Sequence, residues 1–236
     1  MMRLDKAAAL SGLTRSEARK AISAGRVCVG GEAVRDAAMQ VDPDDVTVDG
    51  RRVQAGEIYV MVHKPAGVVT ATEDRRLPAV ADLLPEPVRR RGPGPVGRLD
   101  RDVTGLVLMT TDGQLAHRLI SPRWKAEKVY RARCAGRLTD EDVRRFAGGI
   151  ELSDFTALPA QLAIIEARDD ESLADVTLTE GKFHQVKRMF AAVGHPLMSL
   201  ERIRIGCVAL DPALAPGECR ALTDAEVEGL KKMCDM

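Results

Sequence analysis

The sequence lacks the features that would place it in a membrane or in an oxidising compartment. No window approaches the roughly 18 consecutive apolar residues that span a bilayer, and the first residues lack the apolar stretch of a secretory signal. The five cysteines are odd in number and never form Cys-x-x-Cys, which argues against a disulfide framework or a zinc cluster. We therefore expect a cytoplasmic protein that does not associate with membranes.

Motifs for metals and nucleotide cofactors are also missing. The four histidines form no His-Glu-x-x-His pair or other metal-ligand spacing, so we expect no metal. Residues 92–97 formally satisfy G-x-G-x-x-G, but two prolines remove backbone amides and no helix pattern follows, so a stiff loop is predicted rather than a dinucleotide site. No cofactor is therefore expected.

The chain carries no net charge, but its charges are segregated. Lys and Arg exceed Asp and Glu by 4 in residues 1–35 and by 6 in residues 86–133, whereas residues 36–50 contain five Asp and no base. Such segregation can place basic faces on a neutral molecule, and phosphate contacts respond to the local field. Solvated helix faces would give the same pattern, so charge alone does not decide for nucleic acid.

The first fifty residues predict a compact module of two helices and a hairpin. Thr14 and Glu17 have the spacing of a capping box, in which each side chain satisfies a free amide at a helix start. Gly25 suits the C-terminal cap of that helix, and a short strand pair is predicted around the Gly30-Gly31 turn. Three cations of this helix lie within two turns and can face a phosphate backbone together: Arg15, Arg19 and Lys20.

This module resembles the S4 RNA-binding domain. Arg-Leu-Asp-Lys, Ser-x-Ala-Arg and Gly-Arg-Val occur in the order and at the spacing of that family, over about residues 2–52. The resemblance implies RNA binding, and a helical adaptor that binds protein is the alternative.

A second informative stretch, residues 97–113, is a polar loop that leads into an apolar strand and an Asp-Gly turn. Asp100 lies in the loop between Arg98 and Arg101. An Asp beside Arg commonly serves as a structural ion-pair partner. Paired Arg would also keep the carboxylate ionised by lowering its pKa, as a nucleophile requires.

The motif of this loop is similar to that of the pseudouridine synthases. Gly-Arg-Leu-Asp followed by Thr-Gly-Leu-x-Leu-x-Thr-x-Asp-Gly resembles their catalytic motif, and further matches occur in family order at residues 63–67, 127–130 and 180–190. The similarity is strongest to synthases that act on small-subunit ribosomal RNA. With the S4 module it covers nearly the whole chain.

The resemblance assigns roles to individual residues. It implies that Asp100 is the nucleophile, that Tyr130 packs against the target base, and that Lys187 occupies the place of the family's Arg beside the aspartate. Arg98 would brace the loop or help to extrude the base. If residues 183–193 form a helix, Lys187 lies at the margin of its apolar face and Arg188 points away, toward RNA or solvent.

The predicted fold class is α+β. We expect an S4-like module at residues 1–52 and a larger catalytic domain at residues 57–236, with a mixed, mainly antiparallel sheet flanked by helices. The expected function is isomerisation of a uridine to pseudouridine in ribosomal RNA, most of all in 16S rRNA, free or partly assembled. The alternatives are an enzyme of the same family for large-subunit rRNA and a non-catalytic rRNA-binding or ribosome-binding factor. A monomer is favoured over an oligomer.

Overall fold

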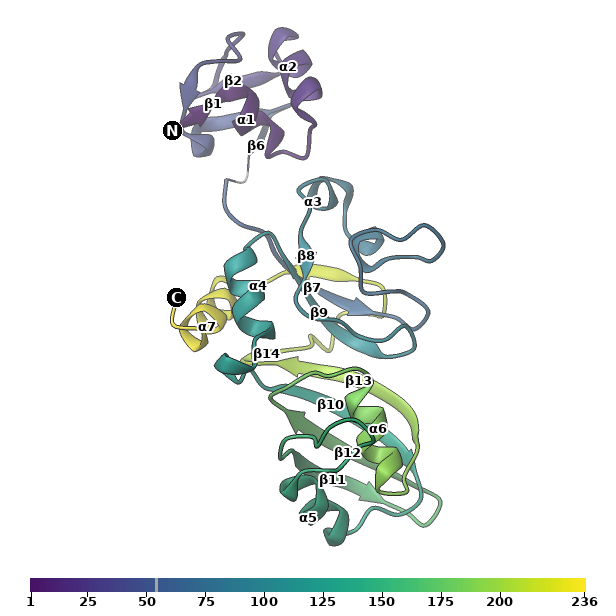
Figure 1. Cartoon of the computed structure of the whole chain (residues 1–236). Coiled ribbons are helices and arrows are strands. Elements are labelled where there is room, and N and C mark those ends of the chain that lie inside the picture. Colours follow the sequence, from purple (N-terminus) through teal and green to yellow (C-terminus); the bar gives the residue numbers. More distant parts are fainter. Residues whose placement is uncertain (54) are drawn as a thin grey trace. The chain divides into compact units, whose positions relative to one another are not determined.

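The computed structural model describes residues 1–53 and 55–236, which divide into two compact units. One unit comprises Met1–Ile58 and Leu84–Pro93, and the other comprises Tyr59–Leu83 and Gly94–Met236 (Figure 1). Among the described residues no helix is long and apolar enough to cross a membrane.

The elements of residues 1–53 agree with the pattern of the sequence. They are β1 (Met2–Arg3), α1 (Leu4–Ala9), α2 (Arg15–Ser23), β2 (Val27–Val29), β3 (Glu32–Ala33), β4 (Gln40–Val41), a 3₁₀ turn (Pro43–Asp45), β5 (Val46–Val48) and β6 (Arg51–Arg52). The predicted capping box is present, since Thr14 accepts from the amide of Glu17 and Glu17 accepts from that of Thr14. Gly25 has φ +74°, as a C-terminal cap of this kind requires.

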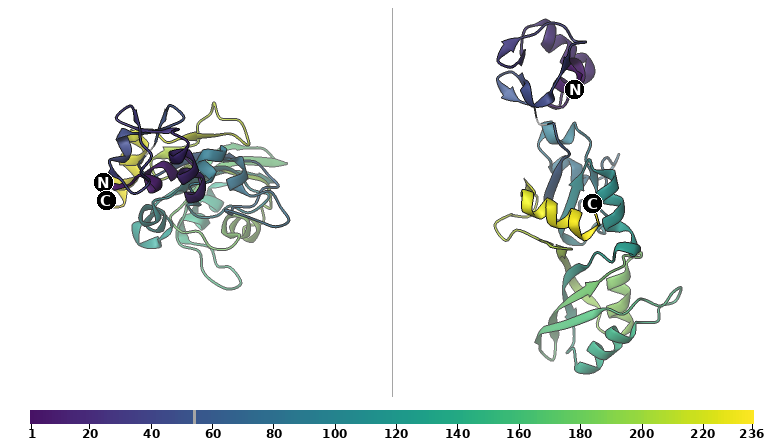
Figure 2. Two further views of the ribbon diagram at one scale, coloured as in Figure 1. Left: turned by 90° about the horizontal axis from the view of Figure 1, so that it is seen from above. Right: turned by 90° about the vertical axis from the view of Figure 1, so that its left-hand side faces the viewer.

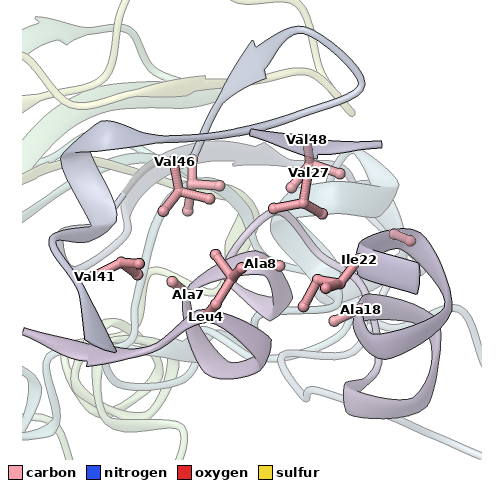
Figure 3. Packing of buried hydrophobic residues seen from close by; sticks show 11 residues of the cluster. Leu4, Ala7, Ala8, Ala18, Ile22, Val27, Val41, Val46 and Val48 are labelled. Atoms are coloured by element: carbon pink, nitrogen blue, oxygen red, sulfur yellow. The ribbon is translucent and has the colours of Figure 1, made fainter. Parts of the chain in front are cut away.

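This part of the chain has a hydrophobic core of its own. Side chains of both helices face the strands, and Figure 3 labels nine of them: Leu4, Ala7, Ala8, Ala18, Ile22, Val27, Val41, Val46 and Val48. The small alanines let the helices approach the sheet closely, and the β-branched valines fill the strand side. The sequence pattern of residues 1–53 is therefore sufficient to close a small apolar core.

The second unit is built on a nine-stranded sheet in the order β11-β12-β10-β13-β9-β7-β15, with β14 on β13 and β8 on β9. Its strands are β7 (Tyr59–Lys64), β8 (Gly94–Pro95), β9 (Thr104–Thr110), β10 (Lys128–Ala135), β11 (Gln161–Ala167), β12 (Glu171–Leu178), β13 (Leu197–Ile205), β14 (Val208–Ala209) and β15 (Cys219–Ala221). Within the described ranges β9 and β13 form its one parallel pair, so the sheet is mixed and mainly antiparallel, as predicted.

Helices cover the two ends of this sheet. They are α4 (Gly113–Ile120), α5 (Asp140–Gly148), α6 (Gln185–Ala192) and α7 (Asp224–Met233), with 3₁₀ turns at Val80–Leu83 and Pro122–Trp124. The short α3 (Glu86–Arg89) belongs to the first unit. Apolar residues of α4 and α7 share one core with β7 and β9, whereas α5 and α6 contact each other through Phe146 and Phe190 beside β10–β13 (Figures 1 and 2).

One local expectation needs correction. The segment Gly92–Gly97 was predicted to be a stiff loop, but Gly94 and Pro95 form strand β8, paired with Thr110 and Met109 of β9. Proline fits there because β8 is a two-residue strand at the sheet margin, where a missing amide costs little. The rejection of a dinucleotide site is unaffected, because a short helix rather than a strand precedes this segment.

Candidate active site

The loop between β8 and β9 presents Asp100, and the polypeptide around it is held from both sides. The hydroxyl of Thr70 accepts from the amide of Leu99 at 3.1 Å and donates to its carbonyl at 2.8 Å. The amide of Val103 donates to the carbonyl of Asp100 at 3.2 Å, which closes a turn. Leu99 is buried, and this anchors the loop on the apolar core. Asp100 is therefore carried by a fixed turn rather than by a free loop.

The segment that follows β7 supplies a second tether to this turn. The carbonyl of Arg101 accepts from the amide of Gly67 at 2.8 Å and from Nζ of Lys64 at 3.2 Å. Lys64 is fully buried, and burial lowers its pKa to about 8. The His-Lys-Pro-Ala-Gly segment thus acts in the structure by holding the catalytic-motif loop.

Helix α6 brings a cation to Asp100 from far along the chain. Nζ of Lys187, in the first turn of α6, lies 3.1 Å from Oδ2 of Asp100. Nε2 of His184, at the N-cap of α6, lies 3.5 Å from Oδ1 of the same carboxylate. His184 has φ +51°, a left-handed conformation that turns the chain into the helix. The two carboxylate oxygens are thus each faced by a different basic side chain.

A second carboxylate shares Lys187. Its Nζ lies 2.7 Å from Oδ1 of Asp102, whose side chain is 73% exposed, against 29% for Asp100. The hydrogen bond from Lys187 holds the pKa of Asp102 below its usual range. Burial opposes the charge of Lys187, but hydrogen bonds to Asp102 and Asp100 outweigh that cost and raise its pKa. Lys187 is therefore a firmly charged ammonium between two carboxylates.

Tyr130 lies on β10 and lines the same cavity as Asp100 and Lys187. The apolar wall of this cavity comes from Val103, Leu178, Val186 and Leu200. Each of these four side chains is less than a tenth exposed. A carboxylate, an ammonium and an aromatic ring therefore meet in a partly apolar pocket, where electrostatic interactions are stronger than in water.

The arginines next to Asp100 in the sequence are not its ion-pair partners in the structure. In the described part of the chain the ion pairs of Asp100 are with Lys187 and His184, although Arg98 lines the same cavity. The cation that contacts Asp100 comes instead from helix α6, far along the chain.

The predicted helix around residue 187 is confirmed as α6, Gln185–Ala192, and its apolar face is buried as expected. Arg188 points away from the Asp100 cavity, but it is not directed at solvent alone. It pairs with Asp154, donates to Oγ of Ser153 at 3.2 Å, and lies 5.0 Å from the centre of the Phe155 ring. Its contacts fasten the segment after α5 to α6.

The cations of α2 lie where the helix pattern placed them, but Arg15 and Arg19 also form ion pairs within the module. Asp5 is fully buried, and it pairs with Arg19 at 3.0 Å and with Arg15 at 3.9 Å. Hydrogen bonding from Arg3 above all, and from Arg19, lowers the pKa of Asp5 to about 2. Arg15 and Arg19 remain more than half exposed, and Lys20 is exposed. The face can still meet phosphate.

His184 and Arg202 are among the residues at the site that had not been singled out from the sequence. His184 belongs to a quoted motif, but nothing in the pattern signals its left-handed conformation. Arg202 of β13 is directly opposite Tyr130 in the sheet register, with Cζ 6.0 Å from the ring centre. In its strand Arg202 alternates with Ile203 and Ile205, a pattern that predicts an exposed side chain, so nothing in the sequence signals its burial. Among residues 1–53 and 55–236 no cluster of side chains suits a metal ion.

Comparison with known proteins agrees with this geometry. A model of the RNA pseudouridylate synthase family matches residues 58–192, and a model of the S4 domain matches residues 2–47. The chain is 43% identical to the Uncharacterized RNA pseudouridine synthase YtzG of Bacillus subtilis over 98% of this chain and 99% of that protein. It is 44% identical to Ribosomal small subunit pseudouridine synthase A of Escherichia coli K12, over 96% of this chain and 98% of the relative.

A solved structure is similar over the same length. The crystal structure of a pseudouridylate synthase is 37% identical, with a TM-score of 0.69, and the match covers 98% of this chain and 100% of the other. The likeness therefore extends through both units of the chain rather than through one motif.

Proposed function

This chain belongs to the RNA pseudouridylate synthase family, and we propose that it isomerises a uridine of small-subunit (16S) ribosomal RNA with Asp100 as the nucleophile. The observation that carries the proposal is the ion pair of 3.1 Å between Asp100 and Lys187 in a cavity that Tyr130 also lines.

The reaction suits these side chains. When the carboxylate of Asp100 bonds to C1′, the bond from C1′ to N1 breaks and its electron pair stays on uracil. The detached uracil turns, C5 bonds to C1′ as the carboxylate leaves, and the proton on C5 is given up while N1 takes up one proton. Attack of the carboxylate on the base instead uses the same groups. No atom is gained, no electron is transferred, and we expect no cofactor.

Each group in the cavity has a task in this scheme. The family resemblance assigns Tyr130 to stacking on the extruded base, and aromatic rings are the usual partners of unstacked bases. Lys187 positions the carboxylate of Asp100 through its ion pair with Oδ2. The apolar wall keeps water from the detached uracil. Arg98, on the same loop, would brace it or help to extrude the base.

The assignment of 16S rRNA rests on the relatives and on the S4 domain. The Escherichia coli relative is named for the small ribosomal subunit, and the S4 domain carries the exposed cations of α2. We expect the protein to act in the cytoplasm, on free or partly assembled RNA, as a monomer. Large-subunit rRNA and binding without catalysis are the two alternatives.

The test compares both ribosomal RNAs from a strain without the gene, complemented with wild type or with Asp100→Asn. Pseudouridines are located by primer extension after carbodiimide labelling. One stop in 16S rRNA should vanish in the deletion strain, return with wild type and stay absent with Asp100→Asn, because the amide is not a nucleophile. Asp102→Asn also loses a carboxylate contact to Lys187 and should keep far more activity than Asp100→Asn.

The other outcomes decide against parts of the proposal. A stop lost from 23S rRNA instead would assign the large subunit. No change in either RNA would favour the non-catalytic factor, and turnover by Asp100→Asn within a few-fold of wild type would exclude the nucleophile.

A further inference from the structure

A second cavity adjoins the one that contains Asp100. It shares Arg98, Tyr130 and Gly181 with the first cavity. Its other described lining residues come from the end of β8, from α4, β10 and β13: Val96, Gly97, Leu119, Ile120, Lys128, Arg202 and Ile205. Three of the described lining residues are cations, and none is a carboxylate.

Arg202 is the least satisfied of these cations. Its residue is 3% exposed, and its Nε donates to the carbonyl of Leu106 at 2.8 Å, which fixes the plane of the guanidinium. Its Nη2 is buried and has no hydrogen-bond partner among the described residues. A buried charged donor without an acceptor is costly, so such a group calls for a ligand or another function.

Lys128 brings a second, half-buried charge to the same place. It lies two residues before Tyr130 on β10, hence on the same face of the sheet, and its Nζ donates to the carbonyl of Leu119 at 3.2 Å. Burial, and then the charge of Arg202, lower its pKa to about 8. Arg98 adds a third cation from the exposed end of the cavity. Three cations that line one cavity without a carboxylate repel one another, and a bound anion would offset this cost.

We propose that Arg98, Lys128 and Arg202 form an anion subsite beside Tyr130 that holds a phosphodiester of the substrate RNA next to the target uridine. A phosphodiester carries a permanent negative charge and several acceptor oxygens, which match a guanidinium fork and an ammonium. Because Tyr130 lines both cavities, a nucleotide with its base against this ring has its backbone within one nucleotide length of the three cations. The inference rests on the proposed function, since it takes the substrate to be RNA.

The direct test is a binding experiment on the full chain at low salt. Uridine, 5′-UMP, 3′-UMP and inorganic phosphate are titrated by calorimetry into wild type, Lys128→Met, Arg202→Lys and Arg204→Gln. Wild type should bind one of the two nucleotides about tenfold more tightly than uridine, because the phosphate forms charge-assisted hydrogen bonds. Lys128→Met should remove most of this preference, and Arg202→Lys, which keeps the charge but loses the fork, should remove part of it.

Arg204→Gln is the matched control. Arg204 lies on the same strand, but it pairs with Glu127 and with the carbonyl of Gly206 and does not line the cavity. It should keep the full preference for the nucleotide. Lys128→Met should also melt no lower than wild type, because it removes a charge that partial burial disfavours, so its loss of binding is not a loss of folding. Equal binding of uridine and both nucleotides to wild type, or an unchanged preference in Lys128→Met, would overturn the subsite.

Two further readouts separate the possible anions. Inorganic phosphate that competes as well as the nucleotides would indicate a site for free anions and overturn the RNA assignment. With an rRNA fragment, Lys128→Met should raise KM more than it lowers kcat; a fall in kcat alone would mean that the cations act on the reacting base instead. The nucleotide titrations need no turnover, so they stand even if the rRNA test excludes the proposed function.

Discussion

The proposed chemistry depends on three side chains, each from a different element. Asp100 comes from the loop before β9, Tyr130 from β10, and Lys187 from the first turn of α6. Lys187 links two acidic side chains, because its ammonium contacts both Asp100 and Asp102. Removal of Lys187 would leave the carboxylates of Asp100 and Asp102 without the ammonium that lies between them, and like charges repel.

Lys187→Ala should lower kcat on rRNA by about 100-fold, because the carboxylate of Asp100 loses the group that positions it. Lys187→Arg should recover part of the activity, since the charge is kept and the geometry changes. Arg188→Ala should act mainly on KM, because Arg188 holds the segment of Asp154 rather than Asp100. Steady-state kinetics on one rRNA fragment measure all three. Full activity of Lys187→Ala with an inactive Arg188→Ala would refute the assignment.

The buried charge of Lys64 makes the free energy of unfolding change with pH in the alkaline range. Its pKa is about 8 in the folded chain, against about 10.4 when unfolded, so burial of its charge is unfavourable below pH 8. Between these two values the unfolded chain binds more protons, and this penalty is relieved as the pH rises. The stability of wild type relative to Lys64→Met should therefore improve between pH 7 and 10.5, by roughly 3 kcal/mol at most.

Urea unfolding of both proteins across this pH range gives the difference directly. Lys128, whose pKa is also about 8, should behave with the same sign in Lys128→Met. A pH-independent difference for both variants would show that these lysines do not titrate as their burial implies.

Among the elements, the junction between β9 and β13 connects the two halves of the large sheet. The two strands run parallel, with Thr104 opposite Glu201 and Gly105 opposite Arg202. Gly105 has φ +102°, and a Cβ on it would lie 2.3 Å from the carbonyl oxygen of Arg202. This close approach requires glycine, and it places the backbone of Arg202 and the loop of Asp100 next to each other.

Gly105→Ala should destabilise the protein by about 3 kcal/mol or more, because it adds backbone strain and forces β9 and β13 apart. Gly113→Ala is the matched control, since no atom lies within 4 Å of its added Cβ and it opens helix α4. That variant should change stability by less than about 1 kcal/mol. The midpoints of urea unfolding measure the stability of both variants. If Gly105→Ala were as stable as Gly113→Ala, the backbones of β9 and β13 could separate at this position at little cost.

At the level of the complete chain, the two units have separate hydrophobic cores and separate clusters of charge. The core of residues 4–53 uses only side chains of the first unit, and the core under α4 and α7 uses only those of the second. Each unit can therefore have a separate function. The exposed cations of α2 belong to the first unit, and the Asp100 cavity belongs to the second.

Deletion of residues 1–52 should leave a folded catalytic unit that binds rRNA more weakly and with a shallower salt dependence. Each lost phosphate contact lowers the slope of log affinity against log salt by about 0.7 for single-stranded RNA. Filter binding over a range of salt concentrations measures it. Lys20→Gln in the full chain should lower the slope by about one contact without a change in melting temperature. An unchanged slope after deletion would show that this unit does not touch RNA.

The identity of the local elements and of the family follows from residues close together in the chain. The capping box of α2, the helix at α6 and the motif around Asp100 are recognisable because their signals are spacings of a few residues. The apolar face of α6 also located Lys187 at its margin, from which it reaches Asp100. Such patterns need no knowledge of what packs against them.

Contacts between distant segments were not accessible in this way, because no spacing rule joins residues that the sheet brings together. The arginines beside Asp100 in sequence do not pair with it, whereas a lysine and a histidine more than eighty residues away do. Two cations of α2 turned out to hold the buried Asp5. The unsatisfied Arg202 faces Tyr130 only through the pairing of β10 with β13. Burial and the choice of ion-pair partner depend on the packed sheet, since only folding sets which charges lose their water and which remain close enough to compensate them.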